Sequence, residues 1–428
     1  MCQSRGLADA NGGLLWEGMR RYRRDEMGRS AGGTDGSTLF DEVTRTDCRG
    51  SRHSEALFTF LNRVDSTFFG RVRETLQEWF AHLPESGRPD VRGRIRSGDD
   101  HEFMGAFWEI YLHEYLTRSG FSAELHPKIP GTGRTPDFRC RKDSTVIFVE
   151  ATIIAPPDSE KAANRREAAA LDALNRTQVT DFMLWLRILE RGTQSLPVAR
   201  LRPQLERWLA SLDADHIAEL YQHDPVVSMP EHELSANGWL VLVRAVPKKP
   251  EKRGEFTERP VGAWGPAQAS LIDTIGPLRA NVEDKARAYG ALTHPYIVAV
   301  LETSSFGNDD IETAEALFGT TQVRFSLVDD STTHERKPDG VWCGPRGPRN
   351  TSVSAVLVAR RMTPWGVTKT EPTLWLNPWA RHPLSAHLAW RSFVPNAEMG
   401  AAASQPAAKP AFEVLGLEAD WPGPEDLC

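Results

Sequence analysis

The segment from Thr135 to Thr152, TPDFRCRKDSTVIFVEAT, decides the fold and carries the candidate site. Two runs within it, Asp137 to Arg141 and Val146 to Thr152, have the residue types of β-strands. They are joined by Lys142-Asp143-Ser144, a connection of hairpin length. Pro136 suits the first position of a strand, because proline cannot donate a hydrogen bond to the ladder. The segment therefore predicts an antiparallel β-hairpin.

Two carboxylates lie at the open end of this hairpin. Asp137 opens the first strand and Glu150 ends the apolar run of the second. Side chains alternate faces along a strand, so Phe148, Glu150 and Thr152 share one face. A carboxylate at the end of a buried strand is costly to desolvate unless it is paired or bound to a metal ion. Two interpretations stay open: the carboxylates bind a metal ion, or Asp137 caps a turn and Glu150 marks an ordinary strand exit.

A helix is expected upstream, from His101 to Ser119. Its apolar residues recur at spacings of three and four, and Gly120 follows, as glycine often does at helix C-termini. Glu109 flanks the apolar stripe and could face the hairpin, whereas Glu114 should point elsewhere. We interpret His113 as a solvated helix residue, although its position four residues after Glu109 could make it a neighbour of that carboxylate.

A further strand is expected over residues 122–129, which gives the order helix, strand, strand, strand. With Pro136-Asp137 and Glu150-Ala151-Thr152, this order resembles the PD-(D/E)XK nuclease superfamily, which has the restriction-endonuclease-like fold. Glu109 matches the acidic residue often found on the first core helix of that superfamily. The resemblance covers residues 101–155, and a looser likeness to an uncharacterised bacterial branch extends over residues 55–390. The motif is short and degenerate, and Thr152 stands where the motif has lysine.

The resemblance implies an α/β fold with a mixed central sheet flanked by helices, to which helical and β additions are attached. It implies a nuclease that hydrolyses nucleic-acid phosphodiester bonds, most simply DNA, with Mg²⁺ or Mn²⁺ as cofactor. Defence against foreign DNA is one role for such an enzyme. By this resemblance the metal ligands are Asp137, Glu150 and the backbone carbonyl of Ala151. Glu109 would bind the ion directly, bind it through water, or serve a second ion.

The missing motif lysine leaves the catalytic step open, because Thr152 cannot supply a positive charge. Related enzymes sometimes take the cation from a neighbouring element, and Lys285 is the candidate here. It lies in an expected helix over 278–292, just before an apolar strand over 296–301. The ordinary alternative is that Lys285 is a solvated helix residue. The functional alternative is a catalytically degenerate nuclease fold that binds nucleic acid or a protein partner without cleavage.

Composition sets broad limits on the protein. The chain has 428 residues and is 40% hydrophobic, which is enough to bury a sizeable core in one elaborated domain or in two or three domains. Its net charge of −7 argues against a general coating of nucleic acid but allows a local basic groove. The candidate basic patches are residues 20–24, 165–166, 248–253 and 336–349.

Cysteine usage and hydropathy indicate the compartment. The five cysteines are scattered and show neither a CxxC pair nor zinc-site spacing. This pattern predicts a reducing compartment without a disulfide scaffold. No apolar run is long enough for a membrane span, so we expect a cytoplasmic protein. A homo-oligomer or a protein partner is compatible with the sequence.

The sequence divides into five parts. We expect a poorly ordered segment over 1–50, a helical extension over 51–100, and the nuclease-like core over 101–302. An insertion at about 160–275 would interrupt this core, which would resume near residue 278. Alternatively, the core continues directly with a helix over 159–174. A β-rich part over 303–395 and a flexible tail over 396–428 would follow.

Overall fold

The structure is a computed structural model, and it describes residues 37–426 with internal gaps. The residues outside the description within this range are 132, 155–157, 224–228, 258, 264–272, 274, 291, 304–308, 326–331, 386–387 and 396–401. The expected poorly ordered segment lies outside the described residues up to residue 36. From residue 37 the expectation is wrong, because Leu39 and Phe40 are buried in the main core and the backbone N–H of Leu39 donates to Gln77 Oε1 at 2.6 Å.

A mixed sheet of eight strands forms the centre of the protein, as expected for an α/β fold. Its spatial order is β1-β2-β3-β8-β13-β14-β15-β16. Strand β8 runs parallel to both of its neighbours, and all its residues are buried, as is usual for parallel strands covered on both faces. The strands are β1 (Ser122–Leu125), β2 (Phe138–Lys142), β3 (Thr145–Ile154), β8 (Tyr296–Glu302), β13 (Ala355–Arg360), β14 (Thr373–Leu376), β15 (Arg391–Pro395) and β16 (Ala402–Gln405).

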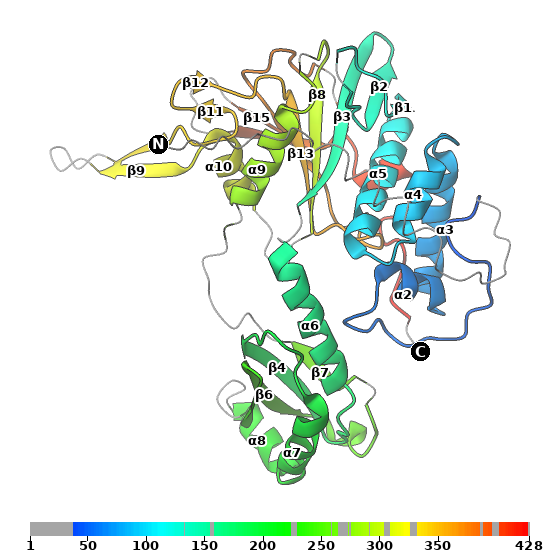
Figure 1. Cartoon of the computed structure of the whole chain (residues 1–428), viewed down its shortest axis with the longest axis vertical. Coiled ribbons are helices and arrows are strands. Elements are labelled where there is room, and N and C mark those ends of the chain that lie inside the picture. The colour runs from blue at the N-terminus through cyan, green and yellow to red at the C-terminus, as the bar shows by residue number, and fades with distance from the viewer. Residues whose placement is uncertain are drawn as a thin grey trace, which may run out of the picture. The chain divides into compact units, whose positions relative to one another are not determined.

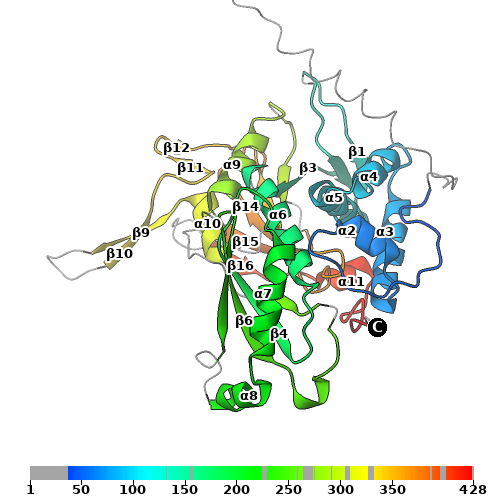
Figure 2. The ribbon, with the colours of Figure 1, turned by 60° about the horizontal axis from the view of Figure 1, so that its bottom comes forward.

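Helices cover both faces of this sheet (Figures 1 and 2). On one face, alternate β3 residues such as Ile147 and Val149 share a core with the first group of helices. On the other face, Phe148 and Ile154 pack with residues of the second group. The first group is α2 (Leu57–Arg63), α3 (Thr67–His82), α4 (Arg88–Ile95) and α5 (Asp100–Arg118), and the second is α9 (Ile275–Ala286) and α10 (Asp310–Phe318).

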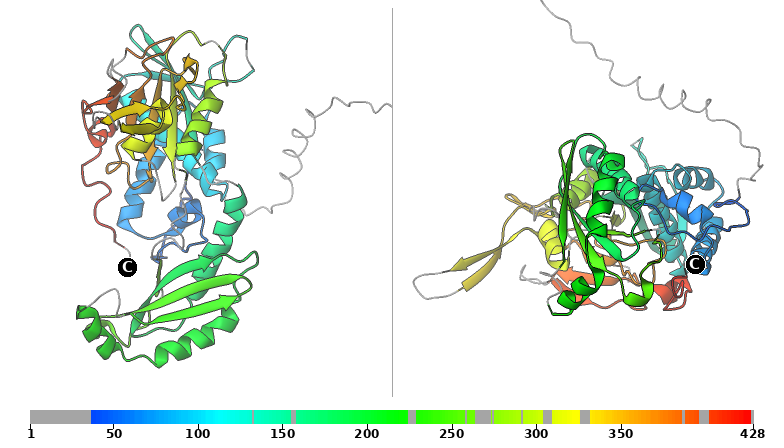
Figure 3. Two further views of the ribbon diagram at one scale, coloured as in Figure 1. Left: turned by 90° about the vertical axis from the view of Figure 1, so that its left-hand side faces the viewer. Right: turned by 90° about the horizontal axis from the view of Figure 1, so that it is seen from below.

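The segment between β3 and α9 builds a second sheet with its own core (Figure 3). The order of this sheet is β5-β6-β4-β7. Strand β3 pairs directly with β8, so the main sheet resumes after the segment rather than continuing through it. The elements of the segment are α6 (Asp158–Leu174), β4 (Phe182–Glu190), α7 (Val198–Ala210), α8 (Ala214–His223), β5 (Glu231–Ala236), β6 (Trp239–Pro247), the short 3-10 helix η1 (Pro250–Lys252) and β7 (Val261–Ala263).

The part after residue 303 is more helical than the sequence suggested. Helix α10 begins with a capping box, in which the Asp309 side chain accepts from the Glu312 backbone and Glu312 accepts from the Asp309 backbone. This D-x-x-E signal before an apolar run was readable from the sequence. Two small hairpins follow, β9 (Thr321–Phe325) with β10 (Thr332–Arg336), and β11 (Cys343–Gly344) with β12 (Gly347–Pro348).

The expected flexible tail is also corrected within its described residues. Strand β16 pairs with β15 at the edge of the main sheet, and the short helix α11 (Ala411–Leu415) buries Leu415 in the core. The Asp426 carboxylate accepts hydrogen bonds from the Ser66 hydroxyl and from the backbone N–H groups of Thr67 and Phe68, at 2.7–2.9 Å. The tail is therefore held by strand pairing and by capping of the α3 N-terminus, which composition alone did not reveal.

Within the described part of the chain, no helix combines the length and the apolar character needed to cross a membrane. The three described cysteines, Cys48, Cys140 and Cys343, are free thiols.

Candidate active site

The β2–β3 hairpin has a two-residue turn, Asp143 and Ser144. Asp143 has a φ of 51°, in the left-handed region that aspartate tolerates in such turns. The register pairs Phe138 with Val149, so Asp137 lies opposite Glu150 one position further along. Asp137 Oδ2 accepts a hydrogen bond of 2.7 Å from the backbone N–H of Ala151. The structure therefore brings together the two predicted carboxylates.

Glu150 is buried and fully paired by residues from the α9 region. Lys285 Nζ lies 2.8 Å from Glu150 Oε1, and the Tyr289 hydroxyl donates to Glu150 Oε2. The Glu150 side chain is only 7% exposed, so both oxygens need partners. Burial, and then the hydrogen bond to Glu150, raise the pKa of Tyr289 well above its usual range. Tyr289 is therefore a neutral phenol that donates to the carboxylate.

Asp137 lies among other acidic groups, and His126 Nδ1 is 3.9 Å from its Oδ1. Burial raises the pKa of its carboxyl well above the usual value, and the charges of Glu150 and Glu109 act in the same direction. The Ala151 hydrogen bond and the Lys285 charge oppose this rise. A bound cation would favour the ionised form of Asp137. The oxygen donors of Asp137 and Glu150 are of the hard type that Mg²⁺ and Mn²⁺ prefer, so these residues fit such an ion.

Glu109 lies beside the hairpin but is held by an arginine. Arg94 of α4 donates from both terminal nitrogens to the two Glu109 oxygens, at 2.7 and 2.6 Å. The two side chains line a cavity of about 210 Å³ together with Ala151 and Thr152. The Glu109 charge therefore acts on Asp137, while both Glu109 oxygens accept hydrogen bonds from Arg94.

Thr152 accepts a hydrogen bond from helix α9. The Asn281 side-chain amide donates to Thr152 Oγ1 at 3.0 Å, which places Thr152 on the face of Glu150, as strand parity predicts. Asn281 Oδ1 is buried and has no hydrogen-bond partner among the described residues. Asn281, Lys285 and Tyr289 recur every four residues and all reach β3 or its hairpin. The four-residue spacing from Lys285 could have identified Asn281 and Tyr289 from the sequence. No sequence pattern pointed to Arg94.

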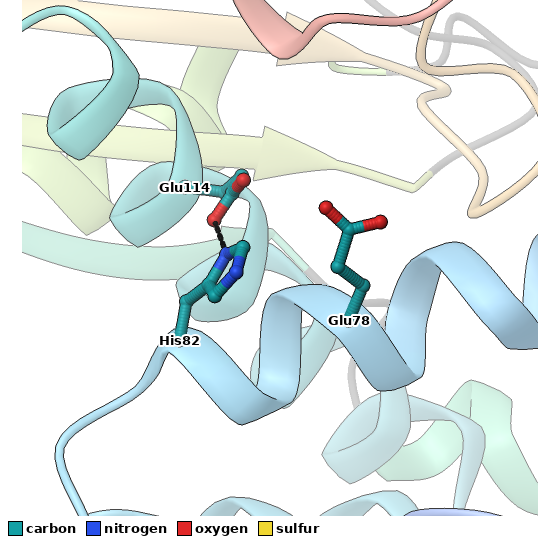
Figure 4. Close-up of side chains that lie close together, drawn as sticks. All are labelled: Glu78, His82 and Glu114. Carbon is teal, nitrogen blue, oxygen red and sulfur yellow. Dashed lines mark hydrogen bonds and ion pairs between the residues drawn. The ribbon is translucent and has the colours of Figure 1, made fainter.

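A second polar cluster joins α3 to α5 (Figure 4). One carboxylate or imidazole atom from each of Glu78, His82 and Glu114 lies within 4.8 Å of the other two. Among the described residues, this is the group of histidine, cysteine and acidic side chains that is spaced closely enough to hold a metal ion. His82 Nδ1 is 2.8 Å from Glu114 Oε2, and Arg118 pairs with both glutamates. Because the Arg118 guanidinium already supplies a cation, we interpret the cluster as an ion-pair network between helices.

The interpretation of His113 as a solvated residue is wrong. His113 is 3% exposed, and Glu114 beside it is 1% exposed. Helix α5 is buried nearly all round because α3, α4 and α11 cover the sides that do not face the sheet. Burial lowers the pKa of His113 to about 4, and its Nδ1 has no hydrogen-bond partner within the described residues.

Most of the candidate basic patches serve contacts within the protein. Arg253 pairs with Asp215, and Lys248 Nζ donates to two backbone carbonyls. Arg349 pairs with Glu283, and Arg336 donates to the carbonyl of Gly319. The patch over residues 20–24 lies outside the described residues.

Comparisons with protein-family models, with curated proteins and with solved structures find no match to this chain.

Proposed function

We propose that this protein is a nuclease that hydrolyses phosphodiester bonds of nucleic acid, most simply DNA, with a divalent cation as cofactor. One observation carries the proposal: Asp137, which is partly buried, and Glu150, which is buried, lie opposite each other at the open end of a hairpin, and Lys285 contacts Glu150. The charges of Glu150 and Glu109 both raise the pKa of Asp137, and this clustering of carboxylates favours a cation site over a purely structural one.

The order of elements supports the same reading. Helix α5, strands β1, β2 and β3, helix α9 and strand β8 follow one another in the main sheet and its covering layers, interrupted by the inserted segment. This order is the one that the resemblance leads us to expect, and it supports the proposal. An elaborated restriction-endonuclease-like core is the finer fold assignment that we propose.

The residues divide the chemical work between them. Asp137, Glu150 and the carbonyl of Ala151 would hold the ion, which supplies charge neutralisation at the phosphate and a water of lowered pKa. The Lys285 ammonium replaces the missing motif lysine and stabilises negative charge near Glu150. Tyr289 fixes the orientation of Glu150 through its hydroxyl. Asn281 and Thr152 present polar atoms beside the site, and the unpartnered Asn281 Oδ1 can accept a hydrogen bond from water.

A second candidate function is a catalytically degenerate fold that binds nucleic acid or a protein partner. The observation in its favour is that Lys285 and Tyr289 occupy both oxygens of Glu150, while Arg94 occupies both oxygens of Glu109. An ion would have to displace at least one of these partners. Loss of those hydrogen bonds would offset part of the binding energy.

The deciding experiment measures cleavage of labelled single-stranded and duplex DNA and RNA with Mg²⁺ or Mn²⁺. We expect cleavage by the wild type and its loss in Asp137→Ala and Glu150→Ala, with the fold checked by circular dichroism. Asp143→Asn, in the exposed hairpin turn, is the matched control and should cleave normally, because asparagine also tolerates the left-handed backbone of this position. Equal cleavage by all variants would assign the activity to another site or to a contaminant. No cleavage by the wild type would favour the binding function.

A further inference from the structure

A basic recess lies on the same sheet face as the two carboxylates. Cross-strand partners point to one face, and the register gives three successive rows: Arg141 with Val146, Arg139 with Phe148, and then the Asp137–Glu150 row. Rows two residues apart along a strand are separated by about 7 Å. The arginines therefore form a short track that ends at the candidate active site.

The recess beside this track has a volume of about 340 Å³. Its lining includes Lys128, Arg139 and Arg141, together with the rings of Phe148 and His294. None of the described residues that line it is acidic, although the whole chain has a net charge of −7. Arg139 pairs with Glu124 of the neighbouring strand, whereas no ion pair of Lys128 or Arg141 is found within the described part of the chain.

The aromatic rings add a second feature. Phe148 and His294 meet edge to face, with their ring centroids 6.1 Å apart, and His294 is exposed. A base can stack on an exposed ring of this kind irrespective of its sequence. Unpaired cations beside aromatic rings are the combination found where proteins bind single strands.

We infer that this recess binds a single strand of nucleic acid beside the scissile phosphate, an inference that rests on the proposed function. Lys128 and Arg141 contact phosphates, and His294 stacks on a base. The volume is at the low end for small-ligand pockets, so it suits one nucleotide unit rather than the width of a duplex. Single-stranded nucleic acid, or a strand separated from its complement, is therefore the substrate class.

The test is fluorescence anisotropy in EDTA, which prevents cleavage. The probes are labelled single-stranded DNA and RNA of about 12 nucleotides, within the site sizes of single-strand binders, and the corresponding DNA duplex. We expect Lys128→Glu/Arg141→Glu to weaken single-strand binding at least about tenfold at 0.1 M salt. Lys128→Ala/Arg141→Ala should lower the salt-dependence slope by about 1.4, since each single-strand phosphate contact contributes about 0.7.

Two controls keep the result specific. Lys369→Glu/Lys409→Glu makes the same change in charge at exposed lysines elsewhere and should bind as the wild type does. Lys128→Arg/Arg141→Lys keeps the charges and should also bind normally. His294→Ala should weaken binding at least about fivefold through lost stacking, without a change in the salt slope.

The outcomes separate this inference from the proposed function. If the wild type cleaves and the recess variants bind and cleave normally, the recess assignment falls and the nuclease function stands. If the wild type binds single strands but never cleaves them, and the recess variants lose that binding, the recess assignment is supported and the nuclease function is ruled out. Preference for the duplex, or no binding of any probe, would overturn the single-strand assignment.

Discussion

Lys285 Nζ lies 2.8 Å from Glu150 Oε1, although the two residues are 135 positions apart in the chain. The contact crosses from α9 to the end of the apolar run of β3. It places a cation on the sheet face that Glu150 shares with position 152, because positions 150 and 152 lie on one face of the strand. A lysine on the covering helix can therefore occupy the region that Thr152 leaves uncharged.

Lys285→Met should lower the cleavage rate about 10²-fold or more, because the ammonium is lost from a site of low dielectric constant. Nucleic-acid binding in EDTA should be retained. Single-turnover kinetics separate the two effects. Arg287→Met is the matched control, because its side chain is 72% exposed near the end of the same helix. A fully active Lys285→Met variant would remove Lys285 from the mechanism.

Thr152→Lys should restore part of the activity in the Lys285→Met background. A lysine at 152 points to the face of Glu150, and the buried Asn281 Oδ1 can accept a hydrogen bond from its ammonium. In the wild-type background the same change should give little gain, because two ammonium groups would repel each other. The measurement is the ratio of rates in the two backgrounds. Equal effects in both would show that positions 152 and 285 act independently.

Asp137→Asn should stabilise the metal-free protein while removing its response to Mn²⁺. The pKa of Asp137 is raised in the folded state, so its ionised form costs stability at neutral pH. As pH falls through the raised pKa, the wild type takes up a proton and this cost disappears. The thermal advantage of the variant should thus be largest at neutral pH and shrink in acid. Thermal shift with and without Mn²⁺ checks this, with Asp143→Asn as the control that should behave as wild type.

Arg94→Ala should release Glu109 and raise the affinity for a divalent ion. The two side chains are 23% and 13% exposed, so the pair is partly buried and its loss should cost about 1–3 kcal/mol of stability. The freed carboxylate would then add an oxygen ligand. Calorimetric titration with Mn²⁺ measures the affinity, and Arg94→Ala/Glu109→Gln should return it to the wild-type value or below. Unchanged affinity in Arg94→Ala would mean that Glu109 cannot reach the ion.

His113 should make the protein sensitive to mild acid. Its pKa is about 4 in the folded state and about 6.5 when unfolded, so the unfolded state binds the proton first as pH falls. The free energy of unfolding should therefore decrease between about pH 6.5 and pH 4, by about 3 kcal/mol at most. His113→Leu should flatten this dependence in urea titrations. His101→Leu, an exposed histidine of the same helix, should keep the wild-type slope.

The sequence by itself determined the features that depend on near neighbours in the chain. Strand periodicity and the short turn indicated the 137–152 hairpin and the shared face of Glu150 and Thr152. Helical spacing indicated α5, and the helix before the 296–301 strand suggested Lys285. These predictions succeeded because alternation and spacing are set by local backbone geometry.

Tertiary structure alone decided which partners occupy the carboxylates. Arg94 reaches Glu109 because α4 packs on α5, and Tyr289 reaches Glu150 because α9 covers the opposite face of the sheet. His113 is buried because other helices surround α5, although its sequence neighbours include polar residues. Burial and charge pairing between distant segments depend on how the layers close over the sheet. Local periodicity does not specify how the helices pack on the sheet. The burial and the ion-pair partners of the site residues therefore became known only from the tertiary structure.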